Sequence, residues 1–168
     1  LHDLGRGTVL DLCCGEEARL VQYLRRQGIE AYGLDRLADA PFAAASDVLE
    51  TEFDAEAFTT VVSHFGFSLH FLVAHYASSE AIEIAKPEAY ARAYMRILNA
   101  LESGGSFIYT PAVIDFEKVL PNSRFKVERT KVPFAAHVLA EKPAEGISLT
   151  PELKDAFGTA VRVTRLSN

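Results

Sequence analysis

The sequence has only two cysteines and fewer basic than acidic residues, and each shortage excludes a class of protein. Cys13 and Cys14 are adjacent, which is too close for an ordinary structural disulfide, and no second pair is present for a zinc site. We therefore expect a reducing, cytoplasmic location and no bound metal. Seventeen basic against 23 acidic residues give a formal charge of -6, which argues against a nucleic-acid partner or an anionic membrane surface.

Long uncharged runs are scarce as well. Only residues 57–79 lack Asp, Glu, Lys and Arg over a length that could cross a bilayer. This run contains three histidines and has no positively charged flank, so we predict a buried strand that leads into a partly buried helix, and no membrane partner.

What is present is enough apolar sequence for one packed domain over residues 1–168, since 49% of the 168 residues are hydrophobic. Apolar runs alternate with helical periodicity, which predicts βαβ units and a mostly parallel sheet. The predicted strands cover residues 8–12, 30–34, 59–65, 106–110, 124–132, 135–141 and 159–165. The predicted helices cover residues 17–27, 151–157 and a segment from 86 that ends at Gly104 and Gly105; residues 43–45 fit a short helix or an edge strand.

The turn after the first strand reads CCGEE and is expected to lie beside Asp35, because ligands in such sheets bind beyond the C-terminal strand ends. A carboxylate there can accept both hydroxyls of an adenosine ribose, in NAD or in S-adenosylmethionine. A pyrophosphate needs bare N–H groups, and Glu16 and Glu17 would place like charge next to it. The turn therefore favours a cationic nucleoside, with Gly15 allowing close backbone approach and Glu17 complementing the following helix dipole.

Three segments carry a family resemblance: VLDLCCGEEARLVQYLRRQGIEAYGLDR, SDVLETEFDAEAFTTVVSH and YMRILNALESGGSFIYT. They resemble, over most of residues 8–111, the motifs of class I S-adenosylmethionine-dependent methyltransferases. Asp11 and Gly15 match the acidic residue and the middle glycine of the first motif, whereas Cys13 and Glu17 replace its outer glycines. The resemblance implies a Rossmann-like α/β fold, a three-layer αβα sandwich with a mostly parallel seven-stranded sheet of order 3-2-1-4-5-7-6, last strand antiparallel.

The resemblance also implies a cofactor site for S-adenosylmethionine. Asp35 would hold the ribose hydroxyls, Asp47 the adenine amino group, and Leu37 would cover the adenine face. The turn after the first strand and the end of the fourth strand would face the methionine moiety. The expected cofactor-binding residues are Asp11, Cys13, Cys14, Gly15, Asp35, Leu37, Asp47, Val48, Ser63 and His64.

Methyl transfer requires proximity, alignment and a nucleophile free of its proton. The histidines of residues 64–75 are the available bases near neutral pH, and we single out His70 as the catalytic candidate. Tyr76, Tyr109 and His137 are weaker candidates. No Asn-Pro-Pro-Tyr or Asp-Pro-Pro-Tyr follows the fourth strand and no Pro-Cys is present, so the resemblance does not extend to methyltransferases that modify bases or glutamine.

Two departures from the family keep the function open. Two motif glycines are replaced, and only seven residues precede Thr8, so the family's N-terminal lid segment is expected to be missing. The first alternative is a methyltransferase that acts on oxygen or nitrogen of a small molecule or a protein side chain. The second is a catalytically impaired domain that serves as a binding or scaffold module. A nicotinamide-dependent oxidoreductase ranks third because of the charged turn. The strand and helix from residue 150 onward would cover a sheet edge or pair with a second copy in a homodimer.

Overall fold

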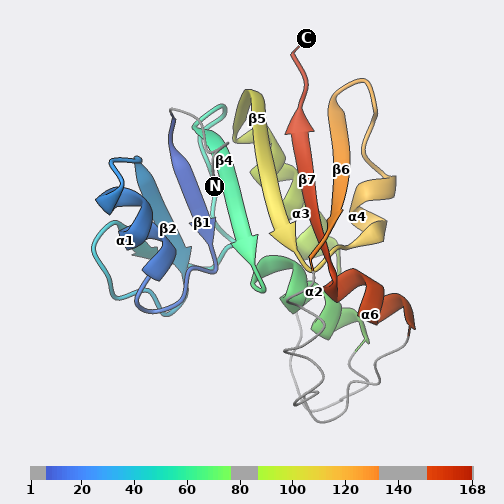
Figure 1. Cartoon of the computed structure of the whole chain (residues 1–168), viewed down its shortest axis with the longest axis horizontal. Coiled ribbons are helices and arrows are strands. Elements are labelled where there is room, and N and C mark those ends of the chain that lie inside the picture. The colour runs from blue at the N-terminus through green and yellow to red at the C-terminus, as the bar shows by residue number, and fades with distance from the viewer. Residues whose placement is uncertain (1–6, 77–86, 133–150, 168) are drawn as a thin grey trace.

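The computed structural model describes residues 7–76, 87–132 and 151–167. Seven strands form one sheet in the order β3-β2-β1-β4-β5-β7-β6, in which β7 runs antiparallel to both of its neighbours and β1 to β5 are parallel (Figure 1). This confirms the strand order that the family resemblance implies. The strands are β1 (Val9–Leu12), β2 (Ala31–Asp35), β3 (Ala43–Ala45), β4 (Phe58–His64), β5 (Leu101–Thr110), β6 (Phe125–Lys131) and β7 (Thr159–Arg165).

The helices form a layer on each side of this sheet. They are α1 (Arg19–Arg26), α2 (Phe67–Tyr76), α3 (Pro87–Asn99), α4 (Ile114–Lys118) and α6 (Pro151–Phe157). Figure 1 shows α1 on one side of the sheet and α3 and α4 on the other. Strand β1 separates two core clusters, because successive strand residues point to opposite faces: Val9 packs with α1, whereas Leu10 and Leu12 join the larger cluster on the α3 side.

The predicted end of the long helix at Gly104 and Gly105 was wrong. Helix α3 ends at Asn99, and β5 already begins at Leu101, whose side chain is fully buried. Leu101 pairs with Phe58, and a register shift then separates that pair from the next one. The helical apolar pattern therefore continues past the real helix end, because pairing with β4 captures Leu101 in the sheet.

Helix α4 was not predicted from the sequence, whereas the remaining described elements agree with the sequence pattern within a few residues. Residues 43–45 form a strand, and the described part of the uncharged run, residues 57–76, contains β4 and α2. Among the described helices, none is both long enough and apolar enough to cross a membrane. The strand predicted at residues 135–141 lies outside the described residues, as does His137.

Candidate functional site

The candidate site lies where the C-terminal ends of the parallel strands β1, β2 and β4 meet. Three connections gather at this edge: the turn after β1, the segment after Asp35 at the end of β2, and the loop of residues 46–52 after β3. The strand order therefore brings the predicted carboxylates to one edge of the sheet, as in other doubly wound α/β folds.

The backbone of the turn after β1 keeps left-handed conformations that glycine normally adopts. Cys13 has a φ of 59°, Gly15 of 73° and Ala18 of 45°. Cys13 occupies the first motif glycine position, so this position retains a glycine-like backbone although its side chain has changed. The third such conformation falls on Ala18, one residue after the position where Glu17 replaces a glycine.

The first three N–H groups of this turn are already occupied by β2. The N–H groups of Cys13 and Cys14 both donate to the carbonyl oxygen of Leu34, at 2.7 and 3.3 Å. The N–H of Gly15 donates to Oδ2 of Asp35 at 3.0 Å. A pyrophosphate needs unpaired N–H groups at such a turn, and these three positions offer none.

Two glycines make room for the paired cysteines. A Cβ on Gly66 would lie 2.4 Å from the Cβ of Cys13, and a Cβ on Gly33 would lie 2.7 Å from the Sγ of Cys14. The two side chains pack against different core clusters, Cys13 against the larger and Cys14 against the smaller. The sequence pattern did not identify either glycine, because each contact joins residues distant along the chain.

Neither thiol is activated in these surroundings, because the pKa of each is raised. Burial, followed by the negative charges of Asp35 and Asp11, raises the pKa of Cys13 to about 12. The pKa of Cys14 rises to about 11, again first because of burial. Thiolates are the reactive form of cysteine, so Cys13 and Cys14 act as packed side chains.

A cavity of about 630 Å³ opens beside this turn, a size typical of small-ligand sites. A Cβ on Gly15 would meet no atom within 4 Å, so Gly15 faces open space. Asp11 is buried against the cavity, and desolvation, aided by the charge of Asp35, raises its pKa to about 7. The lining residues are Asp11, Cys13, Cys14, Gly15, Glu16, Glu17, Ala18, Arg19, Leu20 and His64.

Helix α1 begins at Arg19 and has no acidic residue in its first turn. Glu17 precedes the helix, and its carboxylate pairs with the guanidinium of Arg19 while both side chains remain exposed. Ala18 is the N-cap residue and makes no side-chain hydrogen bond. The cavity therefore adjoins a helix N-terminus that no side chain caps.

Asp35 links this cavity to the second group of predicted residues. Its Oδ1 accepts the N–H of Leu37 at 2.9 Å, and its Oδ2 accepts Gly15. Each carboxylate oxygen can accept a further hydrogen bond, so Asp35 retains capacity for ligand hydroxyls. The Leu37 side chain is 73% exposed beside it.

Asp47 follows β3, as the sequence predicts, and its Oδ1 accepts the N–H of Leu49 at 2.8 Å. The side chain of Val48 packs in the main core. Ser63 is fully committed to the fold: its hydroxyl donates to the Leu12 carbonyl at 3.1 Å and accepts the N–H of Phe67 at 3.0 Å. Ser63 thereby ties the end of β1 to the start of α2.

His70 lies on the exposed side of α2, within electrostatic range of the predicted nucleoside-binding carboxylates. Desolvation, followed by the positive charge of Arg36, lowers its pKa, while Asp35 and Asp47 act in the opposite direction. A histidine with a lowered pKa is mostly neutral at pH 7 and can accept a proton. His64 instead lines the cavity, with its ring edge-on to Phe65 at a centroid distance of 4.8 Å.

Of the weaker catalytic candidates, Tyr109 does not join this group. Burial raises the pKa of Tyr109 well above 10, and its hydroxyl faces that of Tyr94 at 3.4 Å in the core. The side chain of Tyr76 lies outside the described part of the chain.

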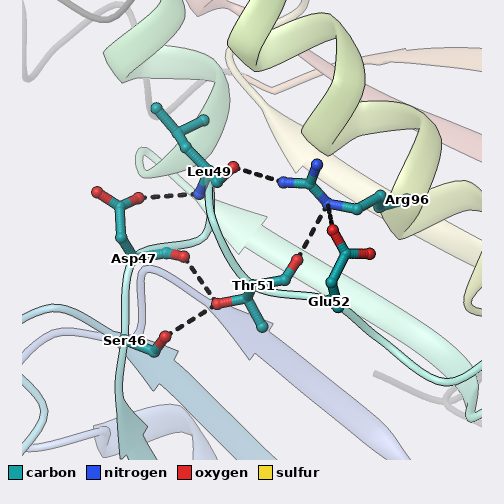
Figure 2. A network of polar contacts seen from close by, with 6 residues as sticks. All are labelled: Ser46, Asp47, Leu49, Thr51, Glu52 and Arg96. Carbon is teal, nitrogen blue, oxygen red and sulfur yellow. Dashed lines mark hydrogen bonds and ion pairs between the residues drawn. The ribbon is translucent and has the colours of Figure 1, made fainter.

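Sequence reasoning missed Arg96, which fastens the loop of residues 46–52 (Figure 2). Its guanidinium donates to the carbonyl oxygens of Leu49 and Thr51 and lies 3.6 Å from the carboxylate of Glu52. No sequence signal connects residue 96 with this loop, because carbonyl oxygens are common to every residue.

Solved structures of other proteins share this fold, although sequence comparisons find no match. No protein-family model matches the chain, and no curated protein matches it in sequence. A methyltransferase from Mesorhizobium loti that depends on S-adenosylmethionine superimposes with a TM-score of 0.60 and 15% identity, over 98% of this chain and 94% of that one.

Two further solved structures agree. The 1,6-didemethyltoxoflavin-N1-methyltransferase of Burkholderia thailandensis, which was solved with its substrate and S-adenosylhomocysteine, gives a TM-score of 0.58 and 16% identity over 99% of this chain and 74% of that one. A TehB-like methyltransferase from Corynebacterium glutamicum gives a TM-score of 0.57 and 17% identity over 97% of this chain and 81% of that one. Taken with the strand order, these likenesses show that the chain has the fold of class I S-adenosylmethionine-dependent methyltransferases.

Proposed function

We propose that this protein is an S-adenosylmethionine-dependent methyltransferase that methylates oxygen or nitrogen of a small molecule or a protein side chain. One observation carries the proposal. The open space beside Gly15 borders a buried carboxylate, Asp11, and is joined by the Gly15 N–H to a second carboxylate, Asp35. A cavity with this charge suits an adenosine ligand that carries positive groups.

The residues present fit the cofactor. Gly15 leaves open the space that a side chain would fill. The carboxylate of Asp35 has oxygen lone pairs left for two ribose hydroxyls. The N–H groups of Cys13, Cys14 and Gly15 are occupied, and the acidic groups Asp11, Glu16 and Glu17 line the same cavity, so a pyrophosphate with two negative charges, and hence NAD, is disfavoured more than a single carboxylate. The negative charge that would repel a phosphate is compatible with a sulfonium and an ammonium group.

Each residue then has a specific role in binding. Asp35 would accept the ribose hydroxyls, Asp47 the adenine amino group, and the exposed Leu37 would cover the adenine. Asp11 would face the positive groups of the methionine part. The N-terminus of α1, which no side chain caps, would attract the carboxylate of that part.

The bound cofactor would supply a methyl group activated for in-line displacement. His70 is the residue in this neighbourhood that is suited to hold the acceptor's proton, because its lowered pKa keeps it largely neutral at pH 7. Asp35 and Asp47 near His70 would favour its charged form once it is protonated. A small-molecule acceptor is further supported by the Burkholderia neighbour, which was solved with bound 1,6-didemethyltoxoflavin.

Isothermal titration of the chain with S-adenosylmethionine, S-adenosylhomocysteine and NAD tests the proposal. We expect the first two to bind and NAD not to bind. Binding of NAD alone would favour the oxidoreductase. Absence of binding by all three would favour a scaffold module.

Variants test the site itself. Asp35→Ala should weaken S-adenosylhomocysteine binding by at least about 100-fold, because two hydrogen bonds to a charged group are lost. Asp39→Ala removes an exposed carboxylate from the same connection and should leave the affinity unchanged. His70→Ala should also preserve affinity while reducing turnover. Parental affinity in Asp35→Ala would remove the site assignment.

A further inference from the structure

We propose that Arg96 is a positioning residue for base recognition: it holds the loop of residues 46–52 so that the carboxylate of Asp47 is aimed at the 6-amino group of the bound purine. The inference rests on the proposed function, since it needs an adenosine ligand at this strand edge. It adds a residue from a different element, α3, that touches no ligand itself.

The side chain of Arg96 binds backbone atoms of the loop. Its Nε donates to the Thr51 carbonyl at 3.0 Å, and a terminal nitrogen donates to the carbonyl of Leu49. The side chain is only 21% exposed, whereas its ionic partner Glu52 is 80% exposed and 3.6 Å away. An exposed ion pair contributes little, so the two carbonyl contacts carry the attachment.

Leu49 transmits this attachment directly to the carboxylate. Its carbonyl oxygen accepts from Arg96, and its N–H donates to Oδ1 of Asp47 at 2.8 Å. One residue therefore connects the guanidinium on one side with the carboxylate on the other, and Figure 2 shows the two groups on opposite sides of the loop. Among the described residues, no hydrogen-bond donor reaches Oδ2 of Asp47, which leaves that oxygen for a ligand.

Thr51 gives a second connection between Arg96 and the same residue. Its carbonyl accepts from Arg96, while its hydroxyl donates to the Asp47 carbonyl at 2.7 Å and lies 3.0 Å from the hydroxyl oxygen of Ser46. The N–H of Ser46 in turn donates to the Asp35 carbonyl at 3.1 Å. The loop is thus tied to α3 at one end and to β2 at the other, which fixes Asp47 relative to Asp35.

Arginine suits this role because its planar fork reaches two acceptors in a set geometry, whereas lysine presents a single ammonium on a flexible stem. Loss of the fork would leave the carbonyls of Leu49 and Thr51 without this donor and allow the turn to shift. A displacement of about 1 Å is enough to misalign a positioned group. We therefore expect base discrimination to fall while ribose binding through Asp35 persists.

The test compares two ligands by isothermal titration: S-adenosylhomocysteine and its analogue with hydrogen in place of the 6-amino group. The parent should bind the first at least about tenfold more tightly, since the amino group donates to a charged acceptor. Arg96→Met and Thr51→Val should each reduce this ratio to less than about threefold. Arg96→Lys should give an intermediate ratio.

Controls separate positioning from general loss of structure. Arg92→Met removes an exposed arginine one turn earlier on α3 and should keep the parental ratio. A merely structural role of Arg96 would weaken both ligands equally and leave the ratio unchanged, which would overturn the inference. If Arg96→Met does not fold, the ligand ratios of Arg96→Lys and Thr51→Val test the inference in its place. A parent that discriminates less than threefold also overturns it, whereas a parent that binds neither ligand refutes the proposed function as a whole.

Discussion

Two connections at the same edge of the sheet are held in place by different means. The turn after β1 is held by its own backbone: three consecutive N–H groups donate to the end of β2, and Gly66 leaves the space that Cys13 fills. The loop of residues 46–52 is held by a side chain from another element, Arg96 on α3.

This difference teaches which changes each connection tolerates. At the turn, most side chains can change if the backbone conformation and the neighbouring space are kept, which explains how Cys13 stands at a glycine position. At the loop, Arg96 donates to backbone carbonyls, so the side chains of Leu49 and Glu52 can vary, whereas Arg96 and the side chains of Asp47 and Thr51 cannot.

The largest effect is expected beneath the turn, at Asp11. Its pKa is about 7 in the folded chain against an ordinary value of 3.8, so between these values the folded state holds a proton that the unfolded state has lost. The free energy of unfolding should therefore fall as pH rises through this window, by about 3 kcal/mol between pH 5 and pH 8, and level off above it.

Urea unfolding at the two pH values measures this fall. Asp11→Asn should remove most of it, whereas Asp39→Asn should retain it. An identical pH dependence in Asp11→Asn and the parent would contradict the assignment.

A steric change next to the turn comes second. Gly66→Ala would place a Cβ 2.4 Å from the Cβ of Cys13, and neither atom can rotate away. We expect a loss of about 1–3 kcal/mol in the free energy of unfolding, typical of overpacking. Chemical denaturation measures it.

Gly158→Ala is the matched control, because its Cβ would meet only two carbonyl oxygens, at 3.5 and 3.8 Å, which are ordinary contact distances. This variant should stay within about 0.5 kcal/mol of the parent. Equal stability of the two glycine variants would show that the turn can move away from Gly66.

The smallest effect is expected at Cys13 itself. Cys13→Gly should relieve a left-handed conformation worth about 1 kcal/mol and lose a similar amount of buried side-chain contact, so the net change should be under about 1 kcal/mol. Cys13→Val, with a branched Cβ at the same φ, should be clearly less stable. Denaturation of the two variants side by side would sharpen the comparison, and a stable Cys13→Val would show that the backbone constraint is weak.

The sequence predicted those parts of the fold and site that depend on local pattern and chain order. Asp35 and Asp47 follow short apolar runs, and carboxylates at the ends of parallel strands meet at one edge whatever the remaining sequence is. The end of α3 was not predictable, because the apolar spacing runs on through Leu101 and only the pairing with Phe58 ends the helix. Likewise, Glu17 follows a pattern that suits the first turn of a helix, yet the helix begins later and Glu17 pairs with Arg19.

By itself, the amino-acid sequence determined the alternation of strands and helices and the type of chemical group at each strand end, since both follow from the periodicity and identity of neighbouring residues. The tertiary structure alone decided which N–H groups are occupied, where Gly66 and Gly33 make room, and that Arg96 holds the loop after β3. The physical reason is the same in each case: these contacts join residues far apart in the chain, often through backbone atoms that carry no sequence signature.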